Sequence, residues 1–423
     1  MDRRFFLKTG GIGLASFGLM AAAPEFLHQF ASGQAMFNPT TGKKKVLVTV
    51  FQRGAVDGLN VLVPYGESEY YNLRPTIAVA KPGETDGAIR IDDTFGLHPS
   101  LKPFEQYFKS GQMAAITAVG SPDNTRSHFD AQDYMESGTP GNKGTSDGWL
   151  NRVMQAAAEA KPSPFRAVSM TQQLPRALYG HAPSVAMANL ADFSVKAGIF
   201  SQDLQGGFEA AWQQNAKDGL GDTGKETFDA VNFLKSANPA QYKPENGAAY
   251  PNSDFGRSMQ QIAQLIKANV GLEVAFTDTG NGIRWDTHTN EGGARGQLSN
   301  FLGQFSQAIA AFAQDLGKRM DDVVVLTMSE FGRTARENGG RGTDHGHANT
   351  MFVLGNSVKG GKVYGEFKGL KSDKLYEGRD LDLTTDFRDV FSEVAAKQMG
   401  VRDLSKVFPN YTANASKFKG FLS

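Results

Sequence analysis

The chain has 423 residues, of which 40% are hydrophobic and 21% are charged, the proportions of an ordinary folded protein and not of a disordered or fibrous one. Its 44 basic and 44 acidic residues cancel, so no overall field attracts nucleic acid or an anionic membrane, and we expect no nucleic-acid partner. The chain contains no cysteine, which excludes disulfides, thiolate ligands and iron–sulfur clusters, so any metal must be bound by nitrogen and oxygen atoms.

The N-terminus has the features of an export signal. A basic segment that contains Arg3 and Arg4 is followed by the uncharged segment 9–23, which is rich in Gly, Ala and Leu. Paired arginines before such a segment are typical of the twin-arginine route, so we expect a twin-arginine signal peptide at residues 1–35. The apolar segment is shorter than the roughly twenty residues that cross a bilayer, so we expect no permanent membrane span. The expected partner is the twin-arginine export machinery, and the expected location is the periplasm or the extracellular space.

Residues 40–420 are expected to form a single α/β domain with a mainly parallel sheet. Short runs of β-branched and apolar residues alternate there with longer helix-like stretches. The predicted strands are 45–51, 113–119, 165–170, 272–276, 322–327 and 350–354.

Three helices are marked by caps or by apolar spacing. Ser146 is predicted to cap a helix over 147–160, and Thr385 a helix over 386–399. Residues 296–318 carry apolar side chains at helical spacing, which predicts a long crossover helix lying on the sheet.

One segment interrupts this alternation. Residues 202–252 are polar, rich in Gly, Asn and Gln, and contain only weak helical patches. We predict that this segment is a lid-like insertion and that substrate specificity depends on it and on the loops.

Side chains suited to chemistry follow four of the predicted strands. In open α/β sheets, ligands bind beyond the carboxyl ends of the strands, and parallel strands bring these ends to one edge. The candidates after the four strands are, in chain order, Asp57; Thr125, Arg126, Ser127 and His128; Asp286 and His288; and Glu330, Asp344, His345 and His347.

The segment 343–347 is the strongest metal signal in the sequence. It places two of only seven histidines and one carboxylate within five residues, and a glycine between two ligands lets the backbone turn both toward one point. We predict that the site binds one or two divalent ions, with Zn, Mn, Mg and Ca as the candidates.

Each candidate also has an ordinary structural explanation. Asp57 precedes a glycine, as turn residues often do, and His128 suits the start of a helix. The spacing of Asp286 and His288 also occurs by chance. The metal prediction therefore depends on all the candidates meeting at one edge of the sheet.

Two groups of His and Asp ligands at one edge favour metal-assisted displacement at phosphorus or sulfur. One ion would activate a serine, threonine or water nucleophile, and a second would stabilise the leaving oxygen. Arg126 would hold the non-bridging oxygens with its guanidinium fork.

The motifs together resemble a known family. The stretches that carry the resemblance are 51–60, 126–138, 144–149, 286–288, 328–334 and 343–347. They resemble the exported DUF1501 family, and the similarity runs from about residue 44 to residue 400. That family is similar to a distant branch of the alkaline phosphatase and sulfatase superfamily. The resemblance implies an alkaline phosphatase-like α/β fold, with helices on both faces of a mainly parallel sheet and a metal-bound nucleophile.

The resemblance also implies roles for single residues. The superfamily's metal ligands are matched, in chain order, by Asp57, by Asp286 and His288, by Glu330 with Asp344 and His345, and by His347. The sulfatase signature Cys/Ser-x-Pro-x-Arg is absent from the sequence, so formylglycine chemistry is not expected. Ser127 is then the first candidate for the nucleophile and Thr125 the second, with His128 as a ligand or a substrate contact.

The sequence therefore predicts an exported metal-dependent hydrolase of phosphate or sulfate esters, acting on a small-molecule or cell-envelope substrate. The alternative is a non-catalytic cell-envelope binding or assembly protein that retains the fold. A third possibility, an exported metal oxidoreductase, is supported only by the export signal and the ligand types.

Overall fold

The structure is a computed structural model that describes residues 44–157, 163, 165–190, 242–280 and 282–423. The predicted signal peptide lies outside the described residues. So does most of the predicted insertion, of which only residues 242–252 are described. Within the described ranges, we find no helix that combines the length and the apolar character needed to cross a membrane.

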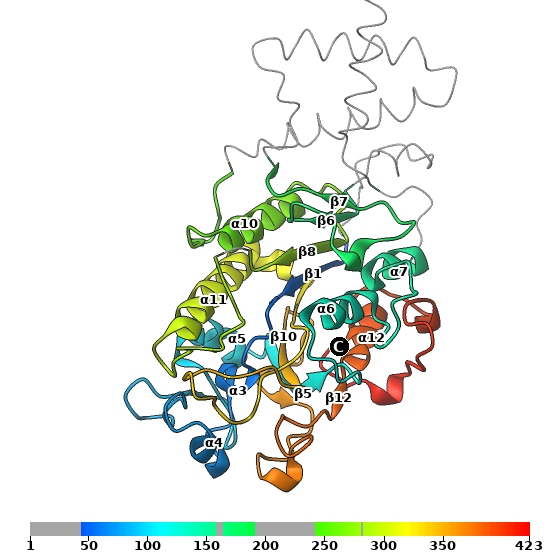
Figure 1. Ribbon diagram of the computed structural model, residues 1–423. Helices are drawn as coiled ribbons and strands as arrows, with labels where there is room; N and C mark the ends of the chain where they lie inside the picture. Colours follow the sequence, from blue (N-terminus) through cyan, green and yellow to red (C-terminus); the bar gives the residue numbers. More distant parts are fainter. Residues whose placement is uncertain (1–43, 158–162, 164, 191–241, 281) are drawn as a thin grey trace, which may run out of the picture.

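The described residues form one large central sheet of nine strands (Figure 1). The strand order is β11-β5-β10-β9-β1-β8-β6-β7, and β12 pairs with β5. The strands are β1 (Val46–Phe51), β5 (Met113–Gly120), β6 (Ala167–Ser169), β7 (Val185–Ala186), β8 (Val274–Asp278), β9 (Val323–Met328), β10 (Asn349–Leu354), β11 (Val363–Tyr364) and β12 (Thr385–Asp386). A second small sheet contains β2 (Leu62–Val63), β4 (Gly96–Leu97) and β3 (Ile89–Arg90). All six predicted strands are present, with shifted ends.

The direction of the strands decides which loops meet. β1 lies between β8 and β9 and is parallel to both. β10 is antiparallel to β9 and to β5, so β5 runs parallel to β9. The carboxyl ends of β1, β5, β8 and β9 therefore lie at one edge of the sheet, and β10 begins at that same edge. The prediction of a mainly parallel sheet is confirmed, and antiparallel β10 is an addition to it.

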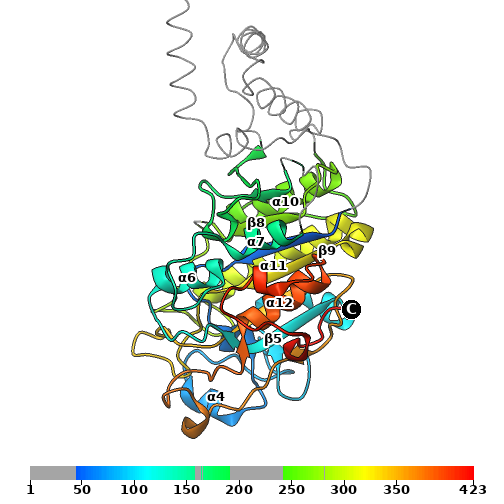
Figure 2. The same cartoon turned by 90° about the vertical axis from the view of Figure 1, so that its right-hand side faces the viewer.

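Helices cover both faces of the sheet, as Figures 1 and 2 show. One face packs against α10 (Asp254–Lys267) and α11 (Gln297–Leu316), and the other against α6 (His128–Ser137), α7 (Trp149–Ala156) and α12 (Phe387–Lys397). The shorter helices are α3 (Gly58–Val61), α4 (Ser68–Leu73) and α5 (Glu105–Lys109).

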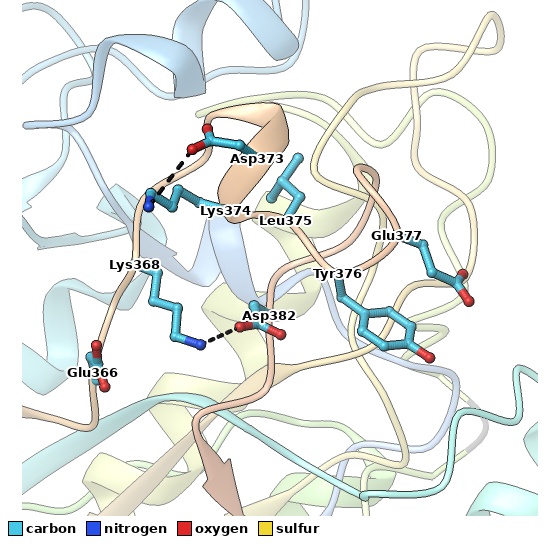
Figure 3. Close-up of a pocket in the computed structure, with 8 residues that line it drawn as sticks. All are labelled: Glu366, Lys368, Asp373, Lys374, Leu375, Tyr376, Glu377 and Asp382. Carbon is cyan, nitrogen blue, oxygen red and sulfur yellow. Dashed lines mark hydrogen bonds and ion pairs between the residues drawn. The ribbon is translucent and has the colours of Figure 1, made fainter.

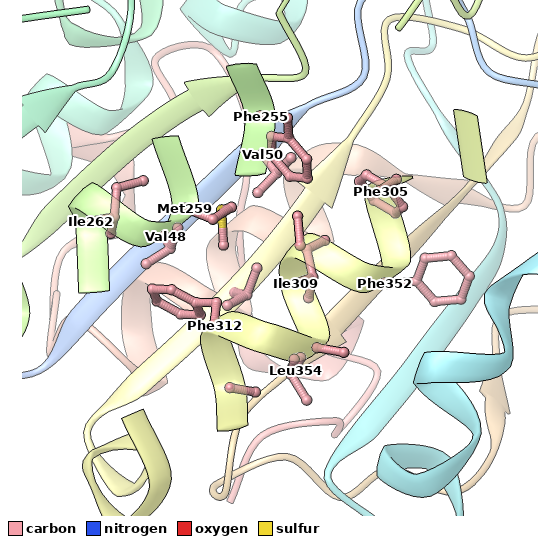
Figure 4. Close-up of a cluster of buried hydrophobic side chains, with 14 of the residues drawn as sticks. Val48, Val50, Phe255, Met259, Ile262, Phe305, Ile309, Phe312, Phe352 and Leu354 are labelled. Atoms are coloured by element: carbon pink, nitrogen blue, oxygen red, sulfur yellow. The ribbon is translucent and has the colours of Figure 1, made fainter. Parts of the chain in front are cut away.

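The alternation of side chains along each strand separates two hydrophobic cores. In β1, Val48 and Val50 point to the core that contains α10 and α11 (Figure 4), whereas Leu47 and Phe51 point to the core that contains α7 and α12. All of these side chains are buried, and each contributes roughly 1.5–3 kcal/mol to folding by leaving water. A strand with apolar residues on both faces is what a sheet covered on both sides requires.

The predicted long crossover helix is confirmed as α11, but both predicted helix caps are wrong. α7 begins at Trp149 with Gly148 as its N-cap, and the hydroxyl of Ser146 bonds to Asp147 instead. α12 begins at Phe387, and its N-cap is Asp386, whose carboxylate accepts from the backbone N–H of Arg388. Thr385, the predicted cap, lies instead in β12, where it pairs with β5.

Candidate metal centre

Three loops pack together at the carboxyl edge of the sheet. They are residues 52–57 after β1, 279–296 after β8, and 329–348 between β9 and β10. Gly54 joins them, because its backbone N–H donates to Glu330 Oε1 at 2.8 Å and a Cβ at this position would lie 3.0 Å from the backbone nitrogen of Asp286. Its φ of +113° also requires glycine.

Three imidazole rings converge above these loops. His128 comes from the first turn of α6, which is capped by Ser127, while His288 and His345 come from the loops after β8 and before β10. The Nε2 atom of His345 lies 3.0 Å from the Nε2 atom of His128 and 3.0 Å from that of His288. All three rings are partly exposed, so the cluster is open to solvent.

The carboxylate of Asp286 completes the cluster. Its Oδ1 atom lies 3.0 Å from His288 Nε2 and 3.2 Å from His345 Nε2, and its Oδ2 atom lies 3.6 Å from His128 Nε2. Potential ligand atoms of His128, Asp286 and His345 all lie within 4.8 Å of one another.

The far nitrogen of each ring is held by an oxygen atom. His128 Nδ1 lies 2.8 Å from Glu330 Oε1, and His288 Nδ1 lies 3.1 Å from Asp344 Oδ1. His345 Nδ1 lies 2.9 Å from the backbone carbonyl of Arg126. A carbonyl oxygen or an ionised carboxylate only accepts, so each Nδ1 carries a hydrogen and each ring directs its Nε2 toward the shared centre, where the Nε2 lone pair is available whenever that atom is not protonated.

The two carboxylates behind the rings are ionised. Burial acts to raise the pKa of Glu330, but hydrogen bonds from His128, Gln132 and the Gly54 N–H keep that pKa below its usual value. A hydrogen bond from Asn338 and a second from His288 lower the pKa of Asp344. Both groups are therefore fixed acceptors at neutral pH.

Asp286 is held as an anion by a buried arginine. Burial acts to raise the pKa of Asp286, but hydrogen bonds from His128, His345 and Arg333 outweigh it and lower that pKa strongly. Arg333 Nη1 donates to Asp286 Oδ1 at 2.7 Å, and the arginine side chain itself is fully buried. The sequence predicts no role for Arg333, although an arginine three residues after Glu330 at a strand end is a signal that it belongs to the site.

This donor set fits a divalent cation. Three Nε2 lone pairs and one carboxylate face a common point, and nitrogen atoms 3.0 Å apart need a positive charge between them. A proton can also meet this need, because hydrogen bonds to Asp286 and Glu330 raise the pKa of His128 to about 9. A bound cation would displace that proton.

Asp57 lies outside this cluster. Its buried carboxylate accepts from the backbone N–H of Leu59 as the N-cap of α3 and forms an ion pair with buried Arg74. Arg74 Nη2 is 3.1 Å from Asp57 Oδ1. Burial acts to raise the pKa of Asp57, and Arg74 brings it below its usual value. The contacts of Asp57 are those of a structural ion pair and not of a ligand in the three-histidine cluster.

His347 also lies away from the convergence point. Its ring stacks on Tyr376 with 4.5 Å between the ring centroids, and burial lowers its pKa. Gly346 between the two histidines is needed for packing, because a Cβ there would lie 2.4 Å from the backbone of Arg333. Of the two histidines in 343–347, the structure brings only His345 into the cluster, while Glu330 and Asp344 hold rings from behind.

The residues before α6 are engaged in local turns. Ser127 Oγ accepts from the backbone N–H of Asp130 at 3.5 Å, and Thr125 Oγ1 accepts from the Ser127 N–H at 3.2 Å. The guanidinium of Arg126 is bound to Glu377 at 2.8 Å and to Asp380 at 2.7 Å. These three candidates lie beside His128 in the chain, and both carboxylate contacts of the arginine are made by Nη2, while its buried Nε has no hydrogen-bond partner among the described residues.

A pocket of about 690 Å³ lies next to this arginine and is lined by residues between 366 and 382 (Figure 3). Glu377, one of the lining residues, is the partner of Arg126, whose carbonyl in turn holds His345. Arg379, from the same segment, donates to the backbone carbonyl of His345 at 2.8 Å. The segment that lines the pocket therefore also contacts the residue that holds His345 and the backbone of His345 itself.

The family model described as "Protein of unknown function (DUF1501)" matches residues 44–410. No curated protein matches the chain at a significant level. Among solved structures, the chain is similar to the PsFucS1 sulfatase from Pseudoalteromonas sp., with 12% identity over 86% of this chain and 69% of that chain and a TM-score of 0.37. A protein in the alkaline phosphatase superfamily from Vibrio parahaemolyticus has 9% identity over 81% and 71% of the two chains and a TM-score of 0.35. The C-terminal periplasmic domain of EcEptC from Escherichia coli, in complex with Zn, has 8% identity over 74% and 73% and a TM-score of 0.35. At TM-scores this low, these likenesses assign neither a substrate nor site residues to this chain.

Proposed function

The chain belongs to the DUF1501 family, and we propose that it is an exported metal-dependent hydrolase of phosphate or sulfate esters. The observation that supports the proposal most is the convergence of three Nε2 lone pairs and the Asp286 carboxylate, with every Nδ1 fixed by an oxygen atom. A site in which each ligand is oriented from behind is characteristic of a metal centre.

His128, His288, His345 and Asp286 would hold the ion. A bound divalent ion would supply Lewis-acid polarisation of the ester's oxygen and a lowered pKa for a nearby hydroxyl or water. Glu330, Asp344 and the Arg126 carbonyl keep the three rings in place.

The chain supplies its own groups for the rest of the reaction. Ser127 is our first candidate for the nucleophile and Thr125 the second, because both stand at the N-terminus of the ten-residue helix α6 beside His128. Backbone N–H groups and the helix dipole at such an end stabilise negative charge as it develops. Arg126 would bind non-bridging oxygens of the ester if a substrate draws its guanidinium away from Glu377, which is half exposed, and from Asp380, which is buried.

The substrate proposed for this site is a small-molecule or cell-envelope ester. Export to the periplasm or beyond by the twin-arginine machinery is part of the same proposal and depends on Arg3 and Arg4. Fusing residues 1–35 to a reporter tests it. The fusion should be exported, and replacing both arginines by lysine should keep the reporter in the cytoplasm. An unchanged export of the lysine variant would contradict the twin-arginine route.

The hydrolase proposal is tested by purifying the mature protein, measuring bound metal, and assaying aryl phosphates, phosphodiesters and aryl sulfates. We expect bound metal at a stoichiometric level and turnover of at least one ester class. His345→Ala should abolish both, whereas the exposed Tyr179→Ala variant should abolish neither. Neither bound metal nor turnover in the unmodified protein would overturn the proposal.

A second candidate function is a non-catalytic envelope binding or assembly protein with the same metal centre. It is favoured by one observation, the pairing of the Arg126 guanidinium with both Glu377 and Asp380. Bound metal without turnover, together with an unchanged cellular phenotype in the double variant Ser127→Ala, Thr125→Ala, would support this candidate over the hydrolase.

A further inference from the structure

The pocket beside Arg126 has a lining of mixed charge. Four carboxylates and two ammonium groups face it, from Glu366, Asp373, Glu377, Asp382, Lys368 and Lys374 (Figure 3). Its volume of about 690 Å³ falls within the range of small-molecule sites, roughly 300–1,000 Å³. The pocket is therefore large enough for a ring-sized ligand.

Most of these charges are already paired. Lys368 lies 2.6 Å from Asp382, Lys374 lies 3.7 Å from Asp373, and Glu377 is bound to Arg126. Among the described residues, Glu366 forms no ion pair, so the lining keeps an excess of negative charge. Since a carboxylate oxygen can accept more than one hydrogen bond, and an ammonium group has three donors, the paired groups still have hydrogen-bonding capacity.

This lining selects among ligand types. A further anionic group would meet the excess of carboxylates, and a cationic group would have to compete with Lys368 and Lys374, which already hold Asp382 and Asp373. An alkyl chain would find few apolar partners, because the lining offers only Leu375 and the ring of Tyr376. A neutral group with several hydroxyls satisfies both kinds of charged side chain without breaking their ion pairs.

The pocket is placed to receive the part of a substrate that lies beyond the reacting ester. Glu377 contacts Arg126, and Tyr376 stacks on His347, two residues after His345. Tyr376 also accepts a hydrogen bond from Asn124 at 3.2 Å, which ties the pocket to the segment before α6. Glu377 and Tyr376, which line the pocket, therefore contact residues that are neighbours in sequence of His128 and His345.

We infer that this pocket binds a neutral, hydroxyl-rich group, such as a sugar ring, that is carried by the ester. The inference rests on the proposed function, because it names the alcohol part of that substrate. Each good hydrogen bond from the pocket contributes about 1 kcal/mol, so the loss of one or two corresponds to roughly a 5- to 30-fold change in affinity.

The test uses phosphonates, which have no ester bond to hydrolyse. Phosphonate analogues of hexose, hexosamine and pentose phosphates are titrated into the full-length, metal-loaded protein by calorimetry, with butylphosphonate as the reference. We expect at least one sugar phosphonate to bind about fivefold or more tightly than butylphosphonate. The double variant Glu366→Ala, Lys368→Ala should bring this ratio close to one, with metal content and melting temperature unchanged. A matched surface variant, Lys102→Ala, should keep the ratio.

Two results would overturn the inference. One is that no sugar phosphonate binds more tightly than butylphosphonate, and the other is that the advantage survives in the double variant. The outcome is separable from that of the proposed function, because a binding advantage without turnover of any ester would leave the pocket assignment standing and remove the hydrolase. Turnover of an ester without a binding advantage for sugar phosphonates would leave the hydrolase proposal standing and remove the pocket assignment.

Discussion

The Nε2 atoms of His128 and His345 lie 3.0 Å apart, although Glu330 and the Arg126 carbonyl take up the hydrogens on the opposite ring nitrogens. Two lone pairs that face each other at this distance repel unless a proton or a cation lies between them. Loops that are distant in the sequence hold the pair together, so the rest of the fold must counter this repulsion.

Metal should stabilise the fold measurably. A ligand that binds only the folded state adds about 2.7 kcal/mol at a concentration of one hundred times its Kd. We expect the melting temperature of chelator-treated protein to rise on addition of Zn²⁺ or Mn²⁺, as measured by differential scanning calorimetry. In His345→Ala the rise should vanish. A rise of equal size in that variant would mean that the ion binds elsewhere.

The groups behind the rings should affect metal affinity without being ligands. Glu330→Gln and Asp344→Asn each remove an ionised acceptor from a histidine Nδ1, and such changes weaken metal binding by about 10- to 100-fold. Competition with a chromophoric chelator measures the affinity. His347→Gln is the control, since that ring stacks on Tyr376 and should leave the affinity unchanged. An unchanged affinity in both acceptor variants would contradict this arrangement.

Gly54 should be required for the position of Asp286. In Gly54→Ala the new methyl group would lie 3.0 Å from the Asp286 backbone nitrogen, so the loop that carries two ligands must shift. Gly83→Ala is a matched control, because Gly83 also has a positive φ, of +91°, but its Cβ would meet no atom within 4 Å. Both variants should lose stability from the strained φ, but only Gly54→Ala should also lose metal affinity. Equal metal affinity in the two variants would show that the close packing is not needed.

The buried pair of Asp57 and Arg74 should matter for stability more than for metal binding. Removing one partner of a buried ion pair costs about 3–5 kcal/mol, because it leaves the other charge buried and unpaired. Urea unfolding of Arg74→Met should show a loss of this size. Arg90→Met breaks the exposed pair with Asp93 and should change stability by less than about 1 kcal/mol. Similar losses in the two variants would contradict the buried pairing.

Stability should fall as the pH falls from about 6.5 to about 4, in part because of His98. Burial lowers the pKa of this residue from 6.5 to about 4, and its ring bonds to the Gly293 carbonyl and the Ser100 N–H. The unfolded chain therefore binds a proton in this window and the folded chain does not, so the free energy of unfolding falls by about 3 kcal/mol between a pH above 6.5 and a pH below 4. Above pH 6.5 neither state binds this proton, so the neutral ring makes its full contribution to stability.

Urea unfolding at several pH values measures this dependence. His98→Gln has no titrating ring, so its stability should depend less steeply on pH between 4 and 6.5 than that of the unmodified protein. Parallel curves for the two proteins would show that His98 does not titrate in this range.

The sequence predicts the sheet well and the site only in part. Six strands and α11 could be predicted because their apolar spacing is strong and local. The candidates His128, Asp286, His288 and His345 could be named from residue types that follow strands. What could not be predicted depends on partners distant in the chain. Arg74 reaches Asp57 across seventeen residues, and Tyr376 stacks on His347 from a later segment.

Helix starts show the same limit on a smaller scale. Ser146 and Thr385 both have the side chain of a good cap, and cap preference is a local property. Whether a residue becomes the cap depends on where the backbone turns, however. At Thr385 that turn is set by pairing of β12 with Val119 of β5, more than 260 residues earlier in the sequence. No local signal carries that information.

Because β10 is antiparallel to β9 and β5, the loop before it and the loop after it lie at opposite edges of the sheet. The loop that enters β10 delivers His345, whereas the loop that leaves it begins at Gly355 on the opposite edge of the sheet, where Asn356 and Lys359 are exposed. A dye, an affinity tag or a surface linker attached at Lys359 would therefore stand a whole strand length away from the three-histidine cluster. The protein can be immobilised there with its cluster facing the solution.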